Sequence, residues 1–168
     1  MIIVNSVVGN IFNNRSLATK YRRKSAEGKC ESLNLSRAEM DHLRLKRTTD
    51  GGTDVGIVLE SDRKLCHGDV LVDSKGKIIV VKQRPERVAC VRVREKNPDR
   101  IAETAAIIGH VIGNRHRPIS VAGGKILFPV MADSEIEVFR KLFPHGSLEL
   151  KTEEKIFKPN GETAGHEH

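Results

Sequence analysis

The segment VACVRVREKNPDRIAETAAIIGHVIGNRHRP, residues 88–118, holds a predicted strand followed by a helix with recognisable signals at both ends. The strand covers residues 88–93, most of which are apolar. Asn97 is a suitable N-cap for the helix, and Pro98 suits its first position because the ring fixes φ where no amide donor is needed. Asp99 adds a negative charge near the positive end of the helix dipole. The sequence therefore predicts a helix that begins at Pro98.

Apolar residues recur at helical spacing through this segment, so they share one face. They are Ile101, Ala105, Ile108 and Ile112. Gly113 and Asn114 accept the left-handed conformation that ends a helix, and Pro118 prevents the helix from resuming. His116 should then lie just beyond the helix end, where its imidazole can point outward. An exposed imidazole held beside a helix terminus is a good metal ligand.

Two strands, a second helix and a last strand are predicted after this segment. The strands lie near 119–121 and 125–129 around the turn Gly123-Gly124, the helix runs from its expected cap Ser134 to Leu142, and the last strand covers 147–150. The order strand–helix–strand–strand–helix–strand is the split βαβ, ferredoxin-like arrangement.

The chain before this region reads as short strands separated by turns. Residues 50–53 and 73–76 each form a turn signal between two apolar stretches, which predicts two hairpins. Ser36 and Glu39 have the spacing of a capping box, so a short helical turn can begin there. The sequence thus predicts a small all-β unit at the amino-terminal end.

We therefore expect an α+β protein with three parts. An all-β domain spans 1–82, a ferredoxin-like βαββαβ domain spans 83–153, and a flexible tail that contains histidines spans 154–168. The link 82–87 is polar and includes a proline, as domain links often do. The end of the chain holds proline and glycine without an apolar period, which is typical of a mobile tail.

Composition limits the class of protein. The 168 residues suit one domain or two small ones, and 38% hydrophobic content is enough for a core. No run of 18 apolar residues is present, and the amino-terminal residues lack the pattern of a signal peptide. The three cysteines form no Cys-x-x-Cys pair, so a disulfide framework is not expected. These features predict a cytoplasmic protein without a membrane span.

The net charge of +7 invites a nucleic-acid interpretation, because lysine and arginine neutralise phosphates. Aromatic residues make up only 4% of the chain, however, and no zinc finger or aromatic sheet motif is visible. Direct binding of nucleic acid is thus not the expected role. An RNA- or ribosome-associated basic protein on a ferredoxin-like fold stays open as the alternative. The simpler interpretation of the charge is a solvated basic surface, or one that docks onto an acidic protein.

The sequence Gly113-Asn114-Arg115-His116 with Pro118, placed after a helix, resembles the signature of the urease accessory protein E (UreE) family. Residues 35–39, 44–52 and 68–71 are similar to the amino-terminal half of that family, in the right order. The resemblance covers roughly residues 1–160. It implies a nickel metallochaperone that donates Ni²⁺ during assembly of the urease active site.

The resemblance also implies where the metal binds. Family members dimerise through their carboxy-terminal domains, so a His116 pair would face one ion across the two-fold axis. Neutral imidazoles suit Ni²⁺, and Cu²⁺ or Zn²⁺ can also bind because affinity alone gives Ni²⁺ no advantage over Cu²⁺. The implied partners are the urease apoprotein complex and the urease accessory GTPase. A general nickel or zinc buffer unconnected with urease is a third interpretation.

Three further histidines are candidate metal ligands. His166 and His168 form a His-x-His pair in the tail, and the family often ends in a histidine-rich segment. They are otherwise solvent-exposed residues or the remnant of a tag. His110 precedes His116 by six residues, and some family members carry a secondary, copper-preferring site there; the alternative is a helix-terminal histidine favoured by the dipole.

The remaining candidates carry no chemistry of their own. Cys66 and His67 are adjacent and so face opposite sides of a strand, which favours a structural role. Glu103 and Glu135 are expected on exposed helix positions, without forming a carboxylate pair. No nucleophile elbow, phosphate loop or His-Glu-x-x-His motif is present. We therefore expect a binding protein and not an enzyme.

Overall fold

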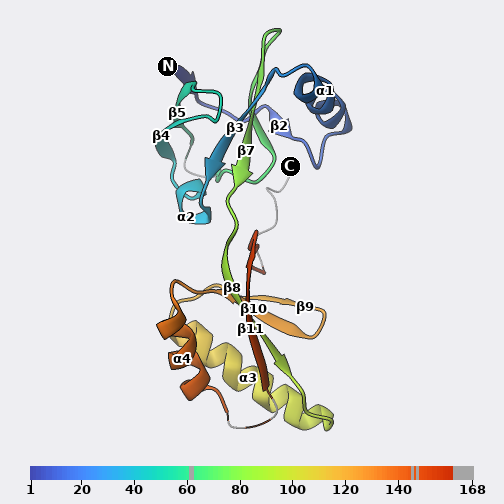
Figure 1. Cartoon of the computed structure of the whole chain (residues 1–168), viewed down its shortest axis with the longest axis vertical. Helices are drawn as coiled ribbons and strands as arrows, with labels where there is room; N and C mark the ends of the chain where they lie inside the picture. The colour runs from blue at the N-terminus through green and yellow to red at the C-terminus, as the bar shows by residue number, and fades with distance from the viewer. Residues whose placement is uncertain (61–62, 145, 147, 161–168) are drawn as a thin grey trace. The chain divides into compact units, whose positions relative to one another are not determined.

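The structure is a computed structural model that describes residues 1–60, 63–144, 146 and 148–160 of the 168-residue chain. Its elements form two compact units (Figure 1), which divide between Arg84 and Pro85. This division lies inside the polar segment 82–87 that the sequence suggested as a link. The last strand of the first unit ends at Gln83 and the first strand of the second begins at Glu86.

The amino-terminal unit contains two sheets. Its elements are β1 (Ile2–Val4), β2 (Gly9–Asn10), α1 (Arg15–Ala26), β3 (Cys30–Leu35), α2 (Arg37–Met40), β4 (Arg44–Thr48), β5 (Asp54–Val58), β6 (Asp69–Asp73) and β7 (Ile78–Gln83). One sheet has the order β1-β5-β4 and the other β2-β6-β7-β3. Both predicted hairpins are confirmed, because β4 pairs antiparallel with β5 and β6 pairs antiparallel with β7.

Side chains along the strands of the second sheet alternate between its two faces, so its apolar residues divide between two clusters. Leu33, Ile79 and Val81 join the larger cluster with residues of the other sheet, such as Val55 and Ile57. Val70, Ile78 and Val80 face the other way and pack against α1. The capping box predicted at Ser36 is confirmed, since the Glu39 amide donates to the Ser36 hydroxyl and the Glu39 carboxylate accepts from the Ser36 amide.

The amino-terminal unit is not all-β, because it contains the twelve-residue helix α1, which the sequence analysis did not predict. Only Leu17 and Tyr21 give α1 an apolar face, too few for a recognisable period. Asn14 caps the helix by accepting from the Leu17 amide. Lys24 is buried in an ion pair with Asp73, so a charged residue occupies part of the face that packs on the sheet.

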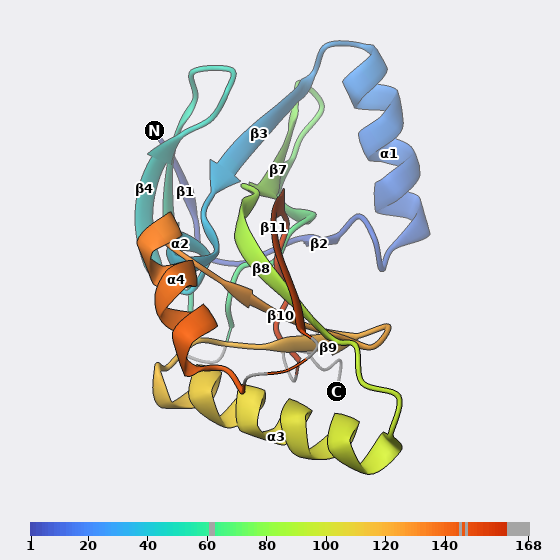
Figure 2. The ribbon, with the colours of Figure 1, turned by 60° about the horizontal axis from the view of Figure 1, so that its bottom comes forward.

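The carboxy-terminal unit has the element order predicted from the sequence. Its elements are β8 (Glu86–Val93), α3 (Pro98–Asn114), β9 (Ser120–Ala122), β10 (Lys125–Pro129), α4 (Asp133–Leu142) and β11 (Leu148–Lys155). The sheet has the order β11-β8-β10-β9, and all neighbouring strands are antiparallel. Helices α3 and α4 lie on the same side of this sheet (Figure 2).

Helix α3 begins as its sequence signals predict. Asn97 accepts from the Asp99 amide, and Pro98 takes the first position. Ile108 and Ile112 are fully buried against the sheet and against Phe128 and Phe139. The prediction that Ser134 caps α4 is wrong: the cap is Ala132, and no side chain bonds there.

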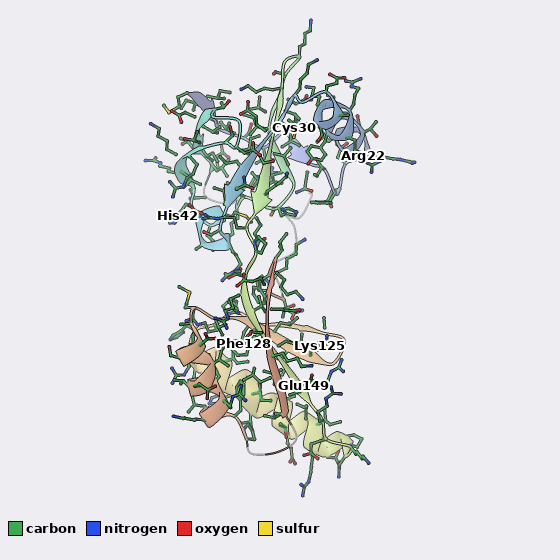
Figure 3. All side chains as sticks on the ribbon, in the orientation of Figure 1. Arg22, Cys30, His42, Lys125, Phe128 and Glu149 are labelled. Atoms are coloured by element: carbon green, nitrogen blue, oxygen red, sulfur yellow. The ribbon has the colours of Figure 1, made fainter. Side chains whose placement is uncertain are left out.

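The opposite face of the carboxy-terminal sheet is covered by the chain that follows β11. Phe157 is 2% exposed and packs against Val88 and Leu127. The flexible tail predicted from residue 154 therefore does not begin there, because β11 extends to Lys155 and Phe157 buries its ring. Figure 3 shows the side chains of both units, among them Phe128 of the carboxy-terminal core.

Within the part of the chain that the structure describes, no helix has the length and apolar character needed to cross a bilayer.

Candidate metal centre

Helix α3 ends in a tight loop that presents His116. The amide of Arg115 donates to the Ile112 carbonyl and that of His116 to the Gly113 carbonyl at 2.9 Å. The amide of Arg117 reaches back to Ile112 at 3.3 Å. These bonds satisfy carbonyls that the helix end would otherwise leave open.

The left-handed residue of this loop is His116 itself, with φ of 53°. The sequence favours Gly113 and Asn114 for that conformation, but both belong to α3. His116 is the one residue other than glycine with positive φ in the described ranges. A side chain in this region carries a steric cost of about 1 kcal/mol, and such outliers gather at functional sites. The His116 side chain is also exposed, so its burial in a core does not force the left-handed backbone conformation.

His110 lies exposed on the last turns of α3, and its ring is already engaged. The Asn114 side-chain amide lies 2.9 Å from His110 Nε2. An amide nitrogen can only donate, so Nε2 accepts and the ring proton of the neutral form sits on Nδ1. This contact fits the helix-terminal interpretation of His110. A metal would take Nε2 only if Asn114 withdrew.

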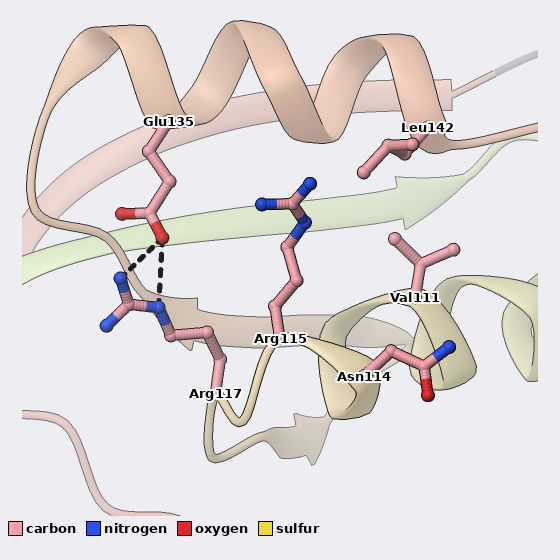
Figure 4. A pocket seen from close by; sticks show the side chains of 6 residues that line it. All are labelled: Val111, Asn114, Arg115, Arg117, Glu135 and Leu142. Carbon is pink, nitrogen blue, oxygen red and sulfur yellow. Dashed lines mark hydrogen bonds and ion pairs between the residues drawn. The ribbon is translucent and has the colours of Figure 1, made fainter.

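A groove lies between the end of α3 and α4, beside the His116 loop (Figure 4). Its volume is about 560 Å³, and its lining residues are Val111, Asn114, Arg115, Arg117, Glu135 and Leu142. The carboxylate of Glu135 accepts from Arg117 Nε at 2.9 Å and from the Met131 amide at 2.8 Å. Glu135 was expected on an exposed position of the helix, but this ion pair holds it half-buried across the groove.

The chain after β11 returns to the loop that carries His116. The Asn160 amide donates to the Ile119 carbonyl at 2.8 Å, and the Asn160 side chain accepts from the Val121 amide. Asn160 is therefore bonded to Ile119, which lies three positions after His116 in the chain. His166 and His168, the predicted tail ligands, lie outside the described residues.

No three histidine, cysteine, aspartate or glutamate side chains gather into a metal-binding group among the described residues. The structure therefore does not bring His116 and His110 into one cluster with a third ligand of that kind. Cys66 and His67 belong to a packed loop instead: His67 Nδ1 accepts from the Gln83 amide at 3.0 Å, and its ring stacks on Phe12. These contacts fit the structural role expected for the pair.

Comparison with known proteins agrees with the sequence signature. Residues 5–84 match the family model for the UreE urease accessory protein, N-terminal domain. The urease accessory protein UreE of Natronomonas pharaonis is 32% identical over 133 residues, which cover 79% of this chain and 61% of that protein. UreE of Lysinibacillus sphaericus is 26% identical over 167 residues, 99% of this chain and 100% of that protein. The chain belongs to the UreE family.

The UreE resemblance expected from the ordered motifs is thus confirmed. UreE 1 of Pseudomonas syringae pv. syringae, 26% identical over 151 residues, covers 82% of this chain and 99% of its own length. The chain therefore spans about three fifths of the Natronomonas protein but nearly the full length of the Pseudomonas and Lysinibacillus proteins.

Sequence reasoning missed two features beside the UreE signature. The Arg117–Glu135 pair joins the His116 loop to α4, and Asn160 ties the chain after β11 to the same loop. Neither contact is local, so no spacing in the sequence announces it. The apolar pair Ile156-Phe157 in an otherwise polar ending was the signal that could have shown that the chain returns to the sheet.

Proposed function

We propose that this protein is a nickel metallochaperone of urease assembly, with His116 as its central ligand. One His116 imidazole from each subunit of a homodimer would hold the Ni²⁺ cargo at the two-fold axis. The observation that supports this is the exposed, left-handed His116 at the end of α3, held by backbone hydrogen bonds on both sides. Membership of the UreE family supports the connection with urease maturation.

His166 and His168 would complete the coordination shell. Asn160 is bonded beside Ile119, and six residues of extended chain from Asn160 to His166 span up to about 20 Å. The three residues from Ile119 back to His116 span about 10 Å at most. The tail histidines can therefore reach His116 of their own subunit.

An incomplete shell suits delivery of a metal better than storage. A fully closed cage of protein ligands retains its metal, as structural zinc sites do, whereas an open position lets an acceptor ligand enter first. Two neutral imidazoles do not select Ni²⁺ over Cu²⁺ or Zn²⁺ by affinity, so selection would depend on geometry and on which metal is available. His110 is a secondary ligand candidate, for a site that would compete with its Asn114 contact.

The partners would be the urease accessory GTPase and the urease apoprotein complex, in the cytoplasm. The protein would catalyse no reaction itself. It would bind, present and release the ion. Imidazole binds metal only when neutral, so nickel affinity should fall as the pH is lowered and protons compete with the metal for the ring nitrogen.

Calorimetric nickel titration of four proteins tests the proposal. His116→Ala should lose the tight binding event and the metal-linked dimer seen by sedimentation, while His166→Ala with His168→Ala should weaken binding but keep one ion per dimer. His42→Ala, a change to an exposed histidine of the amino-terminal unit, is the matched control. Wild-type affinity in His116→Ala would rule out this ligand assignment.

A polyanion-binding role is the second candidate, because the positive charge is concentrated on α1. This helix carries five lysine and arginine residues and no acid. Arg15, Arg22 and Arg23 are exposed and make no ion pair with any described residue; Figure 3 shows Arg22 projecting from the helix. Nucleic acid that co-purifies and dissociates with salt would favour this role, and retention on immobilised nickel would favour the first.

A further inference from the structure

The groove between α3 and α4 contains a cation without an acidic partner. Within the residues that the structure describes, the Arg115 guanidinium makes no hydrogen bond or ion pair, and it lies 5.8 Å from the centre of the Phe139 ring. In Figure 4 the Arg115 side chain points from the end of α3 toward α4, between Glu135 and Leu142. The ring contact restrains this side chain, so less rotamer freedom is lost when an anion binds.

The acid that lines the same groove is already occupied. Glu135 Oε1 accepts from two nitrogens of Arg117, at 2.9 and 2.5 Å, and Oε2 accepts from the Met131 amide at 2.8 Å. The carboxylate thus neutralises Arg117, and neither of its oxygens bonds to Arg115. The groove therefore presents one net positive charge, located on Arg115.

The remaining walls are aliphatic. Val111 lies on the α3 side and Leu142 on the α4 side, and Leu142 is 45% exposed. Asn114 adds an amide that can donate or accept. A planar guanidinium binds a carboxylate through two parallel hydrogen bonds, and the aliphatic walls suit an apolar side chain next to it. A phosphate backbone offers no apolar group to fill these walls.

We propose that the groove docks an acidic segment of a partner protein. A glutamate or aspartate carboxylate would bind Arg115, and a neighbouring aliphatic side chain would lie between Val111 and Leu142. The volume of about 560 Å³ accommodates a few side chains. The proposal does not depend on metal binding by His116, so it goes beyond the nickel role and can fail independently of it.

Methyl and arginine NMR spectra of the metal-free, full-length protein test the proposal. The probe is the peptide acetyl-Leu-Glu-Leu-amide, and its matched control is acetyl-Leu-Gln-Leu-amide. The glutamate peptide should shift the Val111 and Leu142 methyl signals and the Arg115 Nε–H signal in a saturable way. The glutamine peptide should bind about tenfold more weakly, because a charge-assisted pair is replaced by a neutral one.

Two variants assign the effect to the guanidinium. Arg115→Met keeps an unbranched stem over Phe139 and should remove the preference for the glutamate peptide. Arg140→Met, on an exposed arginine of α4 that pairs with Glu137, should keep it. His116→Ala should bind the peptide like the wild type, which separates this result from the nickel titrations.

Three outcomes would overturn the proposal. The first is equal binding of the two peptides, and the second is a preference that survives in Arg115→Met. The third is a different occupant: groove signals that move with protein concentration alone would show a second copy there, and stronger shifts from an oligothymidylate than from the peptide would show a nucleic-acid site.

Discussion

At the scale of single residues, the conformation of His116 separates what the sequence could predict from what it could not. Helix signals placed the end of α3 and the exposed position of His116 correctly. They assigned the left-handed turn to Gly113 and Asn114, because those residues accept it most easily. The helix instead continues through both, and the strained conformation moves to His116. The propensity of a residue for positive φ says whether it tolerates that conformation. It does not say which of several nearby residues, here Gly113, Asn114 and His116, adopts it.

His116→Gly should therefore stabilise the protein while abolishing metal binding. Glycine adopts positive φ without the clash of a Cβ atom, which outweighs its greater flexibility in the unfolded chain. We expect the free energy of unfolding to rise by about 0.5–1 kcal/mol relative to His116→Ala, measured by urea denaturation. Equal stability of the two variants would show that the loop carries no strain.

Glu39 provides a pH-dependent contribution to the stability of the amino-terminal unit. Hydrogen bonds from the Ser36 backbone and the Arg47 side chain lower the pKa of its carboxyl to about 2, from 4.5. Because the folded-state value is the lower one, the contribution is complete above about pH 4.5 and disappears as the pH falls toward 2.

Glu39→Gln keeps the shape and the capping hydrogen bond but removes the charge. At pH 7 this variant should be less stable than the wild type by about 1 kcal/mol, since hydrogen bonds to a charged group are stronger. The difference should vanish near pH 2, where the wild-type carboxyl is protonated. Urea denaturation at several pH values measures it, and stability curves that stay parallel from pH 7 to pH 2 would contradict the assignment.

At the scale of elements, prediction succeeded where local signals were strong. The hairpin β4–β5, the hairpin β6–β7 and the cap of α3 all followed from turn residues or capping residues next to an apolar pattern. Helix α1 was not predicted because its buried face lacks a periodic series of apolar residues. That face contains Leu17 and also Lys24, whose charge is neutralised by an ion pair. The return of the chain after β11 was not predicted because Ile156 and Phe157 are only two apolar residues in a polar stretch, too few to show a period.

Phe157→Ala tests whether that single ring holds the returning chain on the sheet. Removal of a buried phenylalanine should cost about 3 kcal/mol. The Val121 amide, which bonds to Asn160, should lose protection in hydrogen exchange, whereas β10 amides bonded to β8 should keep theirs. Unchanged protection at Val121 would mean that Asn160 is held by other contacts.

At the scale of the whole molecule, the two units have separate cores. The clusters around Leu33 and Leu17 contain only residues before Arg84, and those around Phe139 and Phe157 contain only residues after it. From one polar, proline-containing segment, the sequence suggested a domain link over 82–87. It could not predict which groups meet at the candidate site, since Glu135 and Asn160 reach the His116 loop from elements remote in sequence.

Because the two units have separate cores, we expect a core substitution in one unit to destabilise that unit alone. Phe139→Ala should lower hydrogen-exchange protection throughout α3, β8 and β10 by about 3–5 kcal/mol, with little change at Val55 or Ile79. Val55→Ala should have the reverse pattern. A loss of protection shared equally by both units in either variant would show that they unfold as one cooperative body.

The bonds of Asn160 to the strand after the His116 loop have a practical consequence for purification. An affinity handle of six histidines fused behind residue 168 would begin nine residues from Asn160, within about 30 Å of extended chain. It would place additional imidazoles within reach of His116, and nickel bound by the handle would contribute to every nickel titration. Recombinant protein for metal measurements should therefore carry its handle before Met1, or have it cleaved off.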